Sequence, residues 1–470
     1  MTGLRQKQPR KRVGNVSLEK VYNYIDGHAE DFVQDLVRLV RQPSVSAKDE
    51  GIAECARLVE EMMRETGLST KVLEGEKGNP VVYGEVRSKS SGKTLLFYDH
   101  YDVQPPEPLE KWSCEPFSGK IVDGKIYGRG VIDNKGNFVS RLKAVQAFLE
   151  TDGDVPVNIK FFVEGEEEIG SPNLEPIVRA YRHILGADAA IWEFGGTDRR
   201  GRPHLYLGLK GVLSVELRVK AANKDVHSAN APLIPNAAWR LVWALNTLKD
   251  ENERILIDGF YEDVVPPSAE EIECLRRIPF EEKELKEELG LKQFLKNVSG
   301  FEALKALLYQ PTCTINGLFA GYTGKGSKTV LPHEAMAKLD FRLVPNQKPD
   351  EIFGKLVRHL KRHGFGDFEV IRHGSTEPAK TPINDPFVGL VAKTAEKVYG
   401  KRAVIYPLSA GSGPMHLFRN LLGYPIVSAG CGHPESNTHA PNENLKIESF
   451  ITGTKFIATL ISDFAYAHAG

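Results

Sequence analysis

The chain has 470 residues, 41% of them apolar and 26% charged, which is long enough for two or more domains with apolar cores. A formal net charge of -1 excludes a protein whose overall charge attracts nucleic acid or an anionic membrane. No stretch approaches the roughly 20 apolar residues that a membrane-spanning helix needs. The five cysteines form no CxxC pair and are odd in number, which favours a reducing cytoplasm and assigns any metal site to His, Asp and Glu.

The first half of the chain alternates between helical and extended patterns. The basic stretch 1–17 lacks the apolar run of a signal peptide, and we expect a flexible tail there. Beyond it, apolar periodicity predicts helices and short apolar runs predict strands. The helices are predicted at 18–41, 51–65 and 138–151, and the strands at 94–98, 157–163 and 187–192. This order is typical of an α/β domain with a mostly parallel sheet.

A second pattern begins at residue 209. Residues 211–219 and 335–343 alternate like half-exposed strands, and 235–248 is predicted to be helical, which together favour a small α+β domain. The charged, helix-prone segment 269–308 is interpreted as a solvated helical insertion.

The α/β pattern returns near residue 385. Helices are predicted at 387–399 and 448–465, and a strand at 425–428. The α/β domain is therefore predicted to be split, with parts at 1–208 and 385–470 and the α+β domain at 209–384 between them.

Six carboxylate or imidazole side chains form the candidate chemistry of the chain. They are His100, Asp133, Glu167, Glu168, Glu193 and His439. Several directly follow an apolar run, and the carboxyl ends of strands in an open α/β sheet meet at one crevice, so these side chains should converge. Two histidines with oxygen ligands suit zinc, manganese or cobalt, and a bridging carboxylate with one His per metal is how a two-metal hydrolase is built. A single His after a strand would more often be a surface or capping residue.

Local spacing indicates how these groups could share the work. In an extended segment, His100 and Asp102 point to the same side, so Asp102 can accept the outer ring N–H and fix the tautomer, or else it closes a turn. The adjacent Glu167 and Glu168 can divide between binding metal and accepting a proton, although an acidic run is commonly a solvated loop. The glycine-rich bend 128–136 lacks the order of a phosphate loop, and its aspartate is well placed to bridge two metals.

Five motifs stand out in order along the chain. They are His100-Tyr-Asp-Val-Gln-Pro105, Gly128-Arg-Gly-Val-Ile-Asp-Asn-Lys-Gly136, Glu164-Gly-Glu-Glu-Glu-Ile-Gly-Ser171, Asp225-Val-His-Ser228 and Asp340-Phe-Arg-Leu-Val-Pro345. Together they resemble the M20 metallopeptidases, in particular the branch of cytosolic nonspecific dipeptidases, from about residue 20 to the end. The resemblance implies a split catalytic α/β domain that holds two divalent ions, zinc or alternatively manganese or cobalt. It also implies a ferredoxin-like inserted domain that acts as a lid and forms a homodimer.

The resemblance assigns the metal ligands position by position. Asp133 would bridge the two ions, and the peptide bond after it would be cis. His100 and Glu193 would complete one ion's ligands, and Glu168 and His439 the other's.

The resemblance also assigns three residues that assist catalysis. Glu167 would be the general base and Asp102 would orient the ligating histidine. His227, in the inserted domain, would reach the partner subunit's site and stabilise the oxyanion, and its alternative is a helix-capping residue. His433 competes with His439 as the last ligand, but 438–443 matches the closing motif better.

The remaining assignments concern the substrate's terminal carboxylate. Arg342 and the loop containing Gly411 and Ser412 resemble the groups that hold it, since a guanidinium fork or backbone N–H pair suits a carboxylate. Thr329 and His373 are further candidates for the same pocket.

Glu193 departs from the dipeptidase pattern. Carnosinase-like dipeptidases have Asp at this position, whereas Glu is usual in carboxypeptidases and deacylases. We therefore predict a two-metal hydrolase of small peptides, a dipeptidase or carboxypeptidase that acts next to a free C-terminal carboxylate. The alternatives are a deacylase of N-acyl amino acids, such as a succinyl-diaminopimelate desuccinylase, and a non-catalytic metal-binding relative. A phosphoesterase is disfavoured because the binding residues suit a carboxylate.

Overall fold

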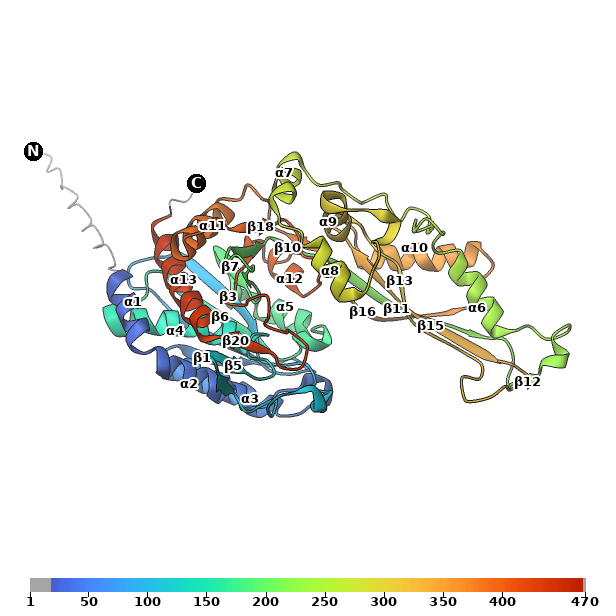
Figure 1. Cartoon of the computed structure of the whole chain (residues 1–470), viewed down its shortest axis with the longest axis horizontal. Coiled ribbons are helices and arrows are strands. Elements are labelled where there is room, and N and C mark those ends of the chain that lie inside the picture. The colour runs from blue at the N-terminus through green and yellow to red at the C-terminus, as the bar shows by residue number, and fades with distance from the viewer. Residues whose placement is uncertain (1–17, 468–470) are drawn as a thin grey trace, which may run out of the picture.

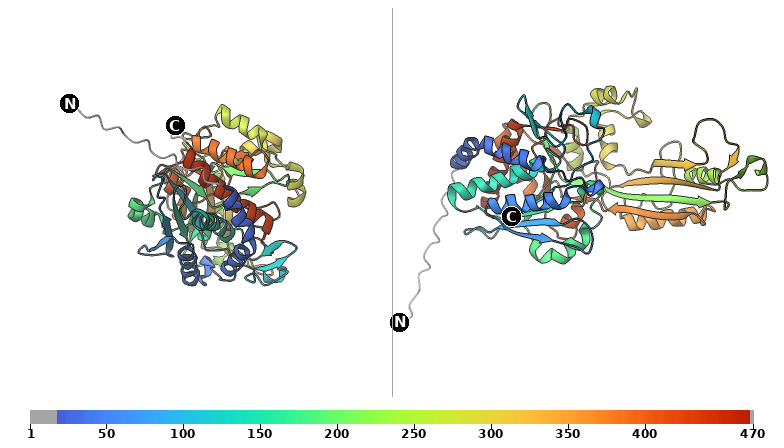
Figure 2. Two further views of the ribbon diagram at one scale, coloured as in Figure 1. Left: turned by 90° about the vertical axis from the view of Figure 1, so that its left-hand side faces the viewer. Right: turned by 90° about the horizontal axis from the view of Figure 1, so that it is seen from below.

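The computed structural model describes residues 18–467, so the tail predicted at 1–17 lies outside the described residues. The molecule is elongated, with a thick body at one end and a narrow lobe at the other (Figures 1 and 2). Within residues 18–467, no helix is both long and apolar enough to cross a membrane.

The body is built on one nine-stranded sheet. Its strands are β1 (Ser69–Leu73), β2 (Val81–Val86), β3 (Thr94–His100), β6 (Asn158–Glu164), β7 (Ala189–Trp192), β8 (Gly196–Thr197), β9 (Pro203–Tyr206), β18 (Val404–Tyr406) and β19 (Ile426–Ser428). The order is β1-β2-β6-β3-β7-β19-β9-β18, with β8 paired to β9, and the central strands β6, β3, β7 and β19 run parallel. This confirms the predicted α/β class and its parallel central sheet.

Helices cover both faces of this sheet. One face carries α1 (Leu18–Gly27), α2 (Ala29–Val40), α3 (Ile52–Glu65), α4 (Lys135–Asp152), α11 (Pro386–Tyr399) and α13 (Ile447–Tyr466), and the other carries α5 (Leu174–Leu185) and α12 (Met415–Arg419). Residues of β3 alternate between the two cores, since Phe97 lies in the first and Tyr98 in the second. The strand is apolar throughout because both of its faces are buried. The single helix predicted at 18–41 is wrong in one respect, because it is divided into α1 and α2.

The lobe has its own core around a four-stranded antiparallel sheet. Its strands are β11 (Gly211–Lys220), β13 (Thr314–Ala320), β15 (Glu334–Leu343) and β16 (Glu369–Thr376), and the helices packed on them are α6 (Ala237–Asn246) and α10 (Pro349–Arg362). The order is β13-β15-β11-β16, so β13 is an edge strand. β12 (Val226–His227) pairs with β14 (Val330–Leu331) at the far tip (Figure 1). The domain boundaries at 208/209 and 384/385 remain predictions.

Two small sheets position loops of the body. β10 (Gly208–Leu209) pairs with β17 (Ala379–Lys380) where the chain leaves and re-enters the body. β20 (Asn444–Lys446) pairs with β5 (Lys125–Tyr127), which also pairs with β4 (Lys120–Val122). The second pairing brings the loop before residue 444 beside the bend at 128–136.

The segment predicted to be a solvated insertion contains α7 (Ala269–Arg277), α8 (Glu282–Leu289) and α9 (Gly300–Tyr309). The prediction is wrong for α7 and α9, which bury Leu275 and Leu304 in a small core that includes Val404 of β18. It is right for α8, none of whose residues is buried. The few apolar residues of α7 and α9 are enough to form this core because Val404, from a strand distant in the sequence, completes it.

Candidate metal centre and active-site cleft

The carboxyl ends of three adjacent parallel strands meet at one cleft. His100 is the last residue of β3, Glu193 directly follows β7, and the 3-10 helix Glu167–Ile169 follows β6. Asp133 comes from the bend before α4, and His439 comes from the loop before β20. The convergence expected from strand positions is therefore present in the fold.

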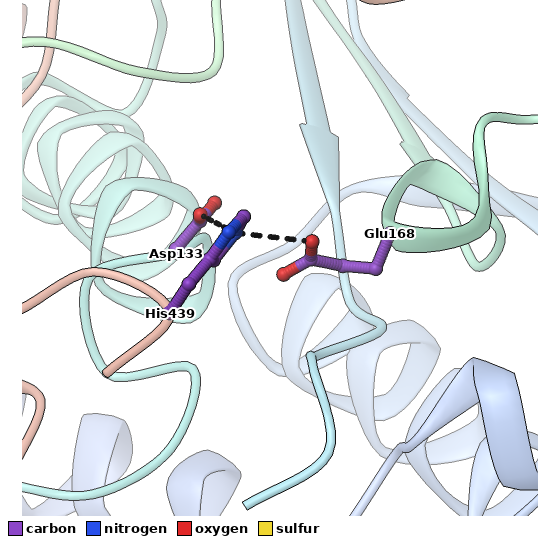
Figure 3. Close-up of side chains that lie close together, drawn as sticks. All are labelled: Asp133, Glu168 and His439. Atoms are coloured by element: carbon purple, nitrogen blue, oxygen red, sulfur yellow. Dashed lines mark ion pairs between the residues drawn. The ribbon is translucent and has the colours of Figure 1, made fainter. Parts of the chain in front are cut away.

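Asp133 lies between the two histidines, with one oxygen towards each. Its Oδ1 is 3.1 Å from His100 Nε2, and its Oδ2 is 2.9 Å from His439 Nε2. Glu168 Oε2 lies 3.1 Å from His439 Nε2, and Figure 3 shows Asp133, Glu168 and His439 pointing towards one another. Glu193 Oε2 lies 3.8 Å from His100 Nε2. The residues thus form two groups of one His and one Glu that share a single aspartate.

The donor set fits divalent cations. The oxygens Glu168 Oε1 and Glu193 Oε2 are buried without a hydrogen-bond partner, although a buried anionic oxygen is costly unless it is paired. Burial raises the pKa of Glu193 to about 8 and, together with repulsion from Glu193, raises that of Glu167. Divalent cations bound by these carboxylates would offset the repulsion between their buried negative charges.

The neighbouring carboxylates also raise the pKa values of the two histidines. Hydrogen bonds to Asp133 and Glu168 raise the pKa of His439 to about 10. Burial opposes protonation of His100, but Asp102 and Asp133 raise its pKa well above the usual value. Asp133, Glu168 and His439 each offer a ligand atom within 4.8 Å of the others. A site that holds protons this firmly releases them when a cation binds.

Asp102 contacts both the histidine and the acidic turn. His100 Nδ1 is 3.0 Å from the backbone oxygen of Asp102 and 3.4 Å from its carboxylate Oδ1. The carboxylate accepts the backbone N–H groups of Glu167 and Glu168 at 3.1 and 3.0 Å. Asp102 therefore positions three of the predicted site residues, and its contact with the acidic turn was not predicted.

Glu443 holds the bend that presents Asp133, and sequence reasoning gave it no role. Its Oε2 accepts from Arg129 Nη1 at 2.8 Å and from Gly130 N at 2.9 Å. Its Oε1 accepts from the backbone N–H groups of Ile132 and Asp133 at 3.0 and 3.2 Å. The peptide bond after Asp133 is cis, as the resemblance implies. The only available signal was the place of Glu443 in the closing motif.

Arg141 of α4 lies beneath the site and joins three strands. Its Nη1 donates to Tyr98 O at 2.8 Å and to Asp99 Oδ1 at 2.7 Å. Its Nη2 donates to Trp192 O at 2.7 Å and to Ala429 O at 3.0 Å. Sequence reasoning missed Arg141. The signal for it is a charged residue within a helix, α4, that is buried along most of its length.

The predicted carboxylate-binding residues divide between adjacent cavities. Arg342 Nη1 donates to Ser412 Oγ at 2.9 Å, and Ser412 and Gly411 line the cleft that contains the metal-ligand candidates. His373 lines a neighbouring cavity, to which Ser412 also contributes, and its Nε2 is 3.0 Å from Glu216 Oε2. Ser412 and the proposed base, Glu167, line both cavities.

Two predicted residues lie away from the cleft of their own chain. His227 is in β12, and Thr329 O accepts from Ser228 N at 3.2 Å, so both are at the far tip of the lobe (Figure 1). His433 lines the cleft, but its Nδ1 faces Glu435 at 3.4 Å. The histidine beside Asp133 and Glu168 is His439.

A parallel-centred α/β sheet whose strand ends carry a carboxylate-bridged pair of histidines defines a metal-dependent hydrolase. The sequence matches Peptidase family M20/M25/M40 over residues 96–463, and the chain belongs to this family and is a metallopeptidase. The resemblance inferred from the motifs is thereby confirmed.

Relatives and solved structures extend over nearly the whole chain. The chain is 29% identical to Beta-Ala-His dipeptidase of Homo sapiens, covering 96% of this chain and 93% of that protein. It is 28% identical to Cys-Gly metallodipeptidase dug1 of Schizosaccharomyces pombe, covering 96% and 99%. The M20 family metallo-carboxypeptidase Sso-CP2 from Sulfolobus solfataricus has a similar structure, with a TM-score of 0.89, 43% identity and coverage of 93% and 99%.

Proposed function

We propose that the protein is a two-metal exopeptidase that cleaves the amide bond next to the free C-terminal carboxylate of small peptides. The observation that carries this proposal is Asp133, whose two oxygens face two histidines from different loops. In a two-metal hydrolase such a carboxylate bridges the ions.

The five ligand candidates divide into two sets around the bridge. Asp133 would contribute to both, His100 and Glu193 to one, and Glu168 and His439 to the other. Zinc suits these nitrogen and oxygen donors, with manganese or cobalt as alternatives. When bound, such ions supply Lewis-acid activation of water and of the scissile carbonyl.

Glu167 is the proposed general base. Its side chain lines the cleft beside Asp133 and Glu193, while Asp102 holds its backbone N–H. From this position its carboxylate takes a proton from the attacking water and returns it to the leaving amine.

Arg342 and Ser412 are proposed to hold the substrate's carboxylate. The guanidinium has five N–H donors, and its hydrogen bond to Ser412 directs it to the rim of the cleft. A planar fork of this kind binds a carboxylate through two parallel hydrogen bonds. His373, in the adjoining cavity, is the further candidate from the same chain.

A homodimer would complete the site. The edge strand β13 exposes Ile315 and Leu318, and α6 exposes Trp239 and Trp243, each 51% to 58% exposed. An edge strand and a helix that both expose large apolar side chains favour pairing with a second copy. We propose that this pairing carries His227 and its neighbours at the lobe tip to the partner's cleft, where an imidazole N–H stabilises the oxyanion.

Carboxypeptidase activity is favoured over strict dipeptidase activity. The 43% identity to a metallo-carboxypeptidase and the presence of Glu193 both support it. N-acyl-amino-acid deacylation is the second candidate, because it also requires a free carboxylate beside the scissile amide. The five free cysteines support a reducing, cytoplasmic location.

The test uses protein stripped of metal and reconstituted separately with zinc, manganese or cobalt. We expect release of the C-terminal residue from peptides with a free carboxylate, and little cleavage of the same peptides as C-terminal amides. Arg342→Met should remove this discrimination, and Arg342→Lys should restore only part of it because it lacks the fork. Equal cleavage of acids and amides by the unsubstituted protein, or no peptide cleavage with any of the metals, contradicts the proposal.

A further inference from the structure

Aromatic rings form one wall of the cleft beyond the metal-ligand candidates. Phe194 and Tyr206 have ring centroids 5.1 Å apart, Tyr206 and Tyr406 stack at 4.7 Å, and His204 lies 5.1 Å from Tyr406. These rings line the same cleft, of about 610 Å³, as Asp133. The wall begins one residue after Glu193, so it adjoins the reacting centre.

The backbone holds this wall in place. Tyr206 and Tyr406 are register partners on the parallel strands β9 and β18. The loop after β7 packs closely on the segment after β19, because a Cβ at Gly195 would lie 2.3 Å from Gly430 N. The rings are therefore placed before any ligand arrives, and binding against them costs little ordering entropy.

Two imidazole nitrogens in the cleft lack partners. His204 Nε2 and His433 Nε2 are buried and have no hydrogen-bond partner among the described residues, and both side chains line the cleft. A buried polar atom without a partner is costly. An apolar surface with a few convergent polar atoms is typical of a ligand pocket, and here the polar atoms suit the peptide or acyl groups of a substrate.

The carboxylates on this side of the cleft are already paired. Asp198 contacts Arg202 at 2.7 Å, and Glu281 contacts Arg199 at 3.8 Å. Apart from the metal-ligand candidates and the proposed base, no unpaired carboxylate lines the cleft within residues 18–467. A free substrate ammonium would therefore find no dedicated partner there.

The distance of the wall from the carboxylate-binding residues indicates which part of a bound substrate it contacts. Lys210 N donates to Gly411 O at 2.9 Å, next to Ser412. Lys210 is four residue steps along mostly extended chain from Tyr206, which corresponds to about 13 Å. The wall and Ser412 line the same cleft but are separated by about this distance. A side chain on the residue that bears the terminal carboxylate stays close to Ser412, so the wall is placed for the residue on the amino side of the scissile bond.

We propose that Phe194, Tyr206 and Tyr406 form a subsite for an apolar or aromatic side chain on the amino side of the scissile bond. The inference rests on the proposed function and deepens it. The substrates it selects are peptides with such a side chain behind an acylated or peptide-bonded nitrogen. The ring faces bury the side chain, and aromatic pairs add to the stabilisation that burial provides.

The test compares kcat/KM for N-acetyl-Phe-Leu, N-acetyl-Gly-Leu and unblocked Phe-Leu. We expect the unsubstituted protein to favour N-acetyl-Phe-Leu over N-acetyl-Gly-Leu by about 10- to 100-fold and to prefer it to Phe-Leu. Replacing both rings, in Tyr206→Ser with Tyr406→Ser, should bring the Phe/Gly ratio close to one. Tyr181→Ser on α5, outside the cleft, is the matched control and should keep the ratio.

Inhibition of the unsubstituted protein provides a measurement that is independent of variant folding. The analogue of N-acetyl-Phe-Leu in which CH₂–NH replaces the scissile amide keeps its terminal carboxylate on Leu, and it should inhibit at least about tenfold more strongly than the same analogue of N-acetyl-Gly-Leu. Equal inhibition, or a Phe/Gly ratio that survives in the double variant, overturns the subsite. Absence of hydrolysis of all three peptides contradicts the proposed function instead, so the two failures are distinguishable.

Discussion

Glu167 and Glu168 are neighbours in the chain but differ in their contacts. Glu168 Oε2 lies 3.1 Å from His439 Nε2 and accepts from Gln104 Nε2 at 2.8 Å. Glu167 lines the open cleft, and its backbone N–H is held by Asp102. These different contacts are the basis for proposing Glu168 as a metal ligand and Glu167 as the base.

Conservative substitutions should separate these two roles. Glu167→Gln should retain metal and substrate binding while losing about a hundredfold or more in kcat, since only the proton acceptor is removed. Glu168→Gln should lose metal. Metal content by mass spectrometry and steady-state kinetics test both variants. The reverse pattern, with metal lost from Glu167→Gln alone, would move the base to position 168.

At the scale of elements, the site depends on how three strands end together. Arg141 contacts the carbonyls of Tyr98, Trp192 and Ala429, at the ends of β3, β7 and β19, and forms a buried ion pair with Asp99 at 2.7 Å. Burial raises the pKa of Asp99 to about 6 despite the guanidinium. The helix below the sheet therefore aligns the strand ends that carry the metal-ligand candidates.

Removing this connection should be strongly destabilising. Arg141→Met leaves a buried carboxylate and several carbonyls without their donor, so we expect a loss of about 3–5 kcal/mol in unfolding free energy. Arg179→Met is the matched control, because that arginine forms an exposed pair with Glu175 on α5, worth about 0.5 kcal/mol or less. Urea denaturation of the metal-free proteins measures both. Equal midpoints for the two variants would contradict the role given to Arg141.

At the scale of the whole molecule, the main feature is that the tip of the lobe lies far from the cleft of the same chain. His227 lies in β12 at the end of the lobe, far from the body in the views of Figures 1 and 2. The apolar residues of β13 and α6 provide a surface on which a second copy can pair. Each active site would then combine residues from two chains.

Mixing two inactive variants tests this arrangement. Glu167→Ala and His227→Ala homodimers should each be inactive, but a mixed dimer has one cleft with both residues. Random pairing makes half the dimers mixed, each with one competent site of two, so coexpression should recover roughly a quarter of the unsubstituted activity. Adding Leu318→Lys to both chains should abolish recovery by weakening the pairing. No recovery while mixed dimers are demonstrably present contradicts the shared site.

The sequence by itself determined the class of sheet, the family and the set of candidate ligands. This was possible because each signal is local, as when His100 ends an apolar run or Glu193 directly follows one. Only the tertiary structure decided which groups support them. Arg129 and Glu443 form a buried pair across 314 positions, and Tyr206 stacks on Tyr406 from a strand 200 positions later. No periodicity encodes such pairs, because they depend on which strands lie side by side and on which loops the sheet brings together.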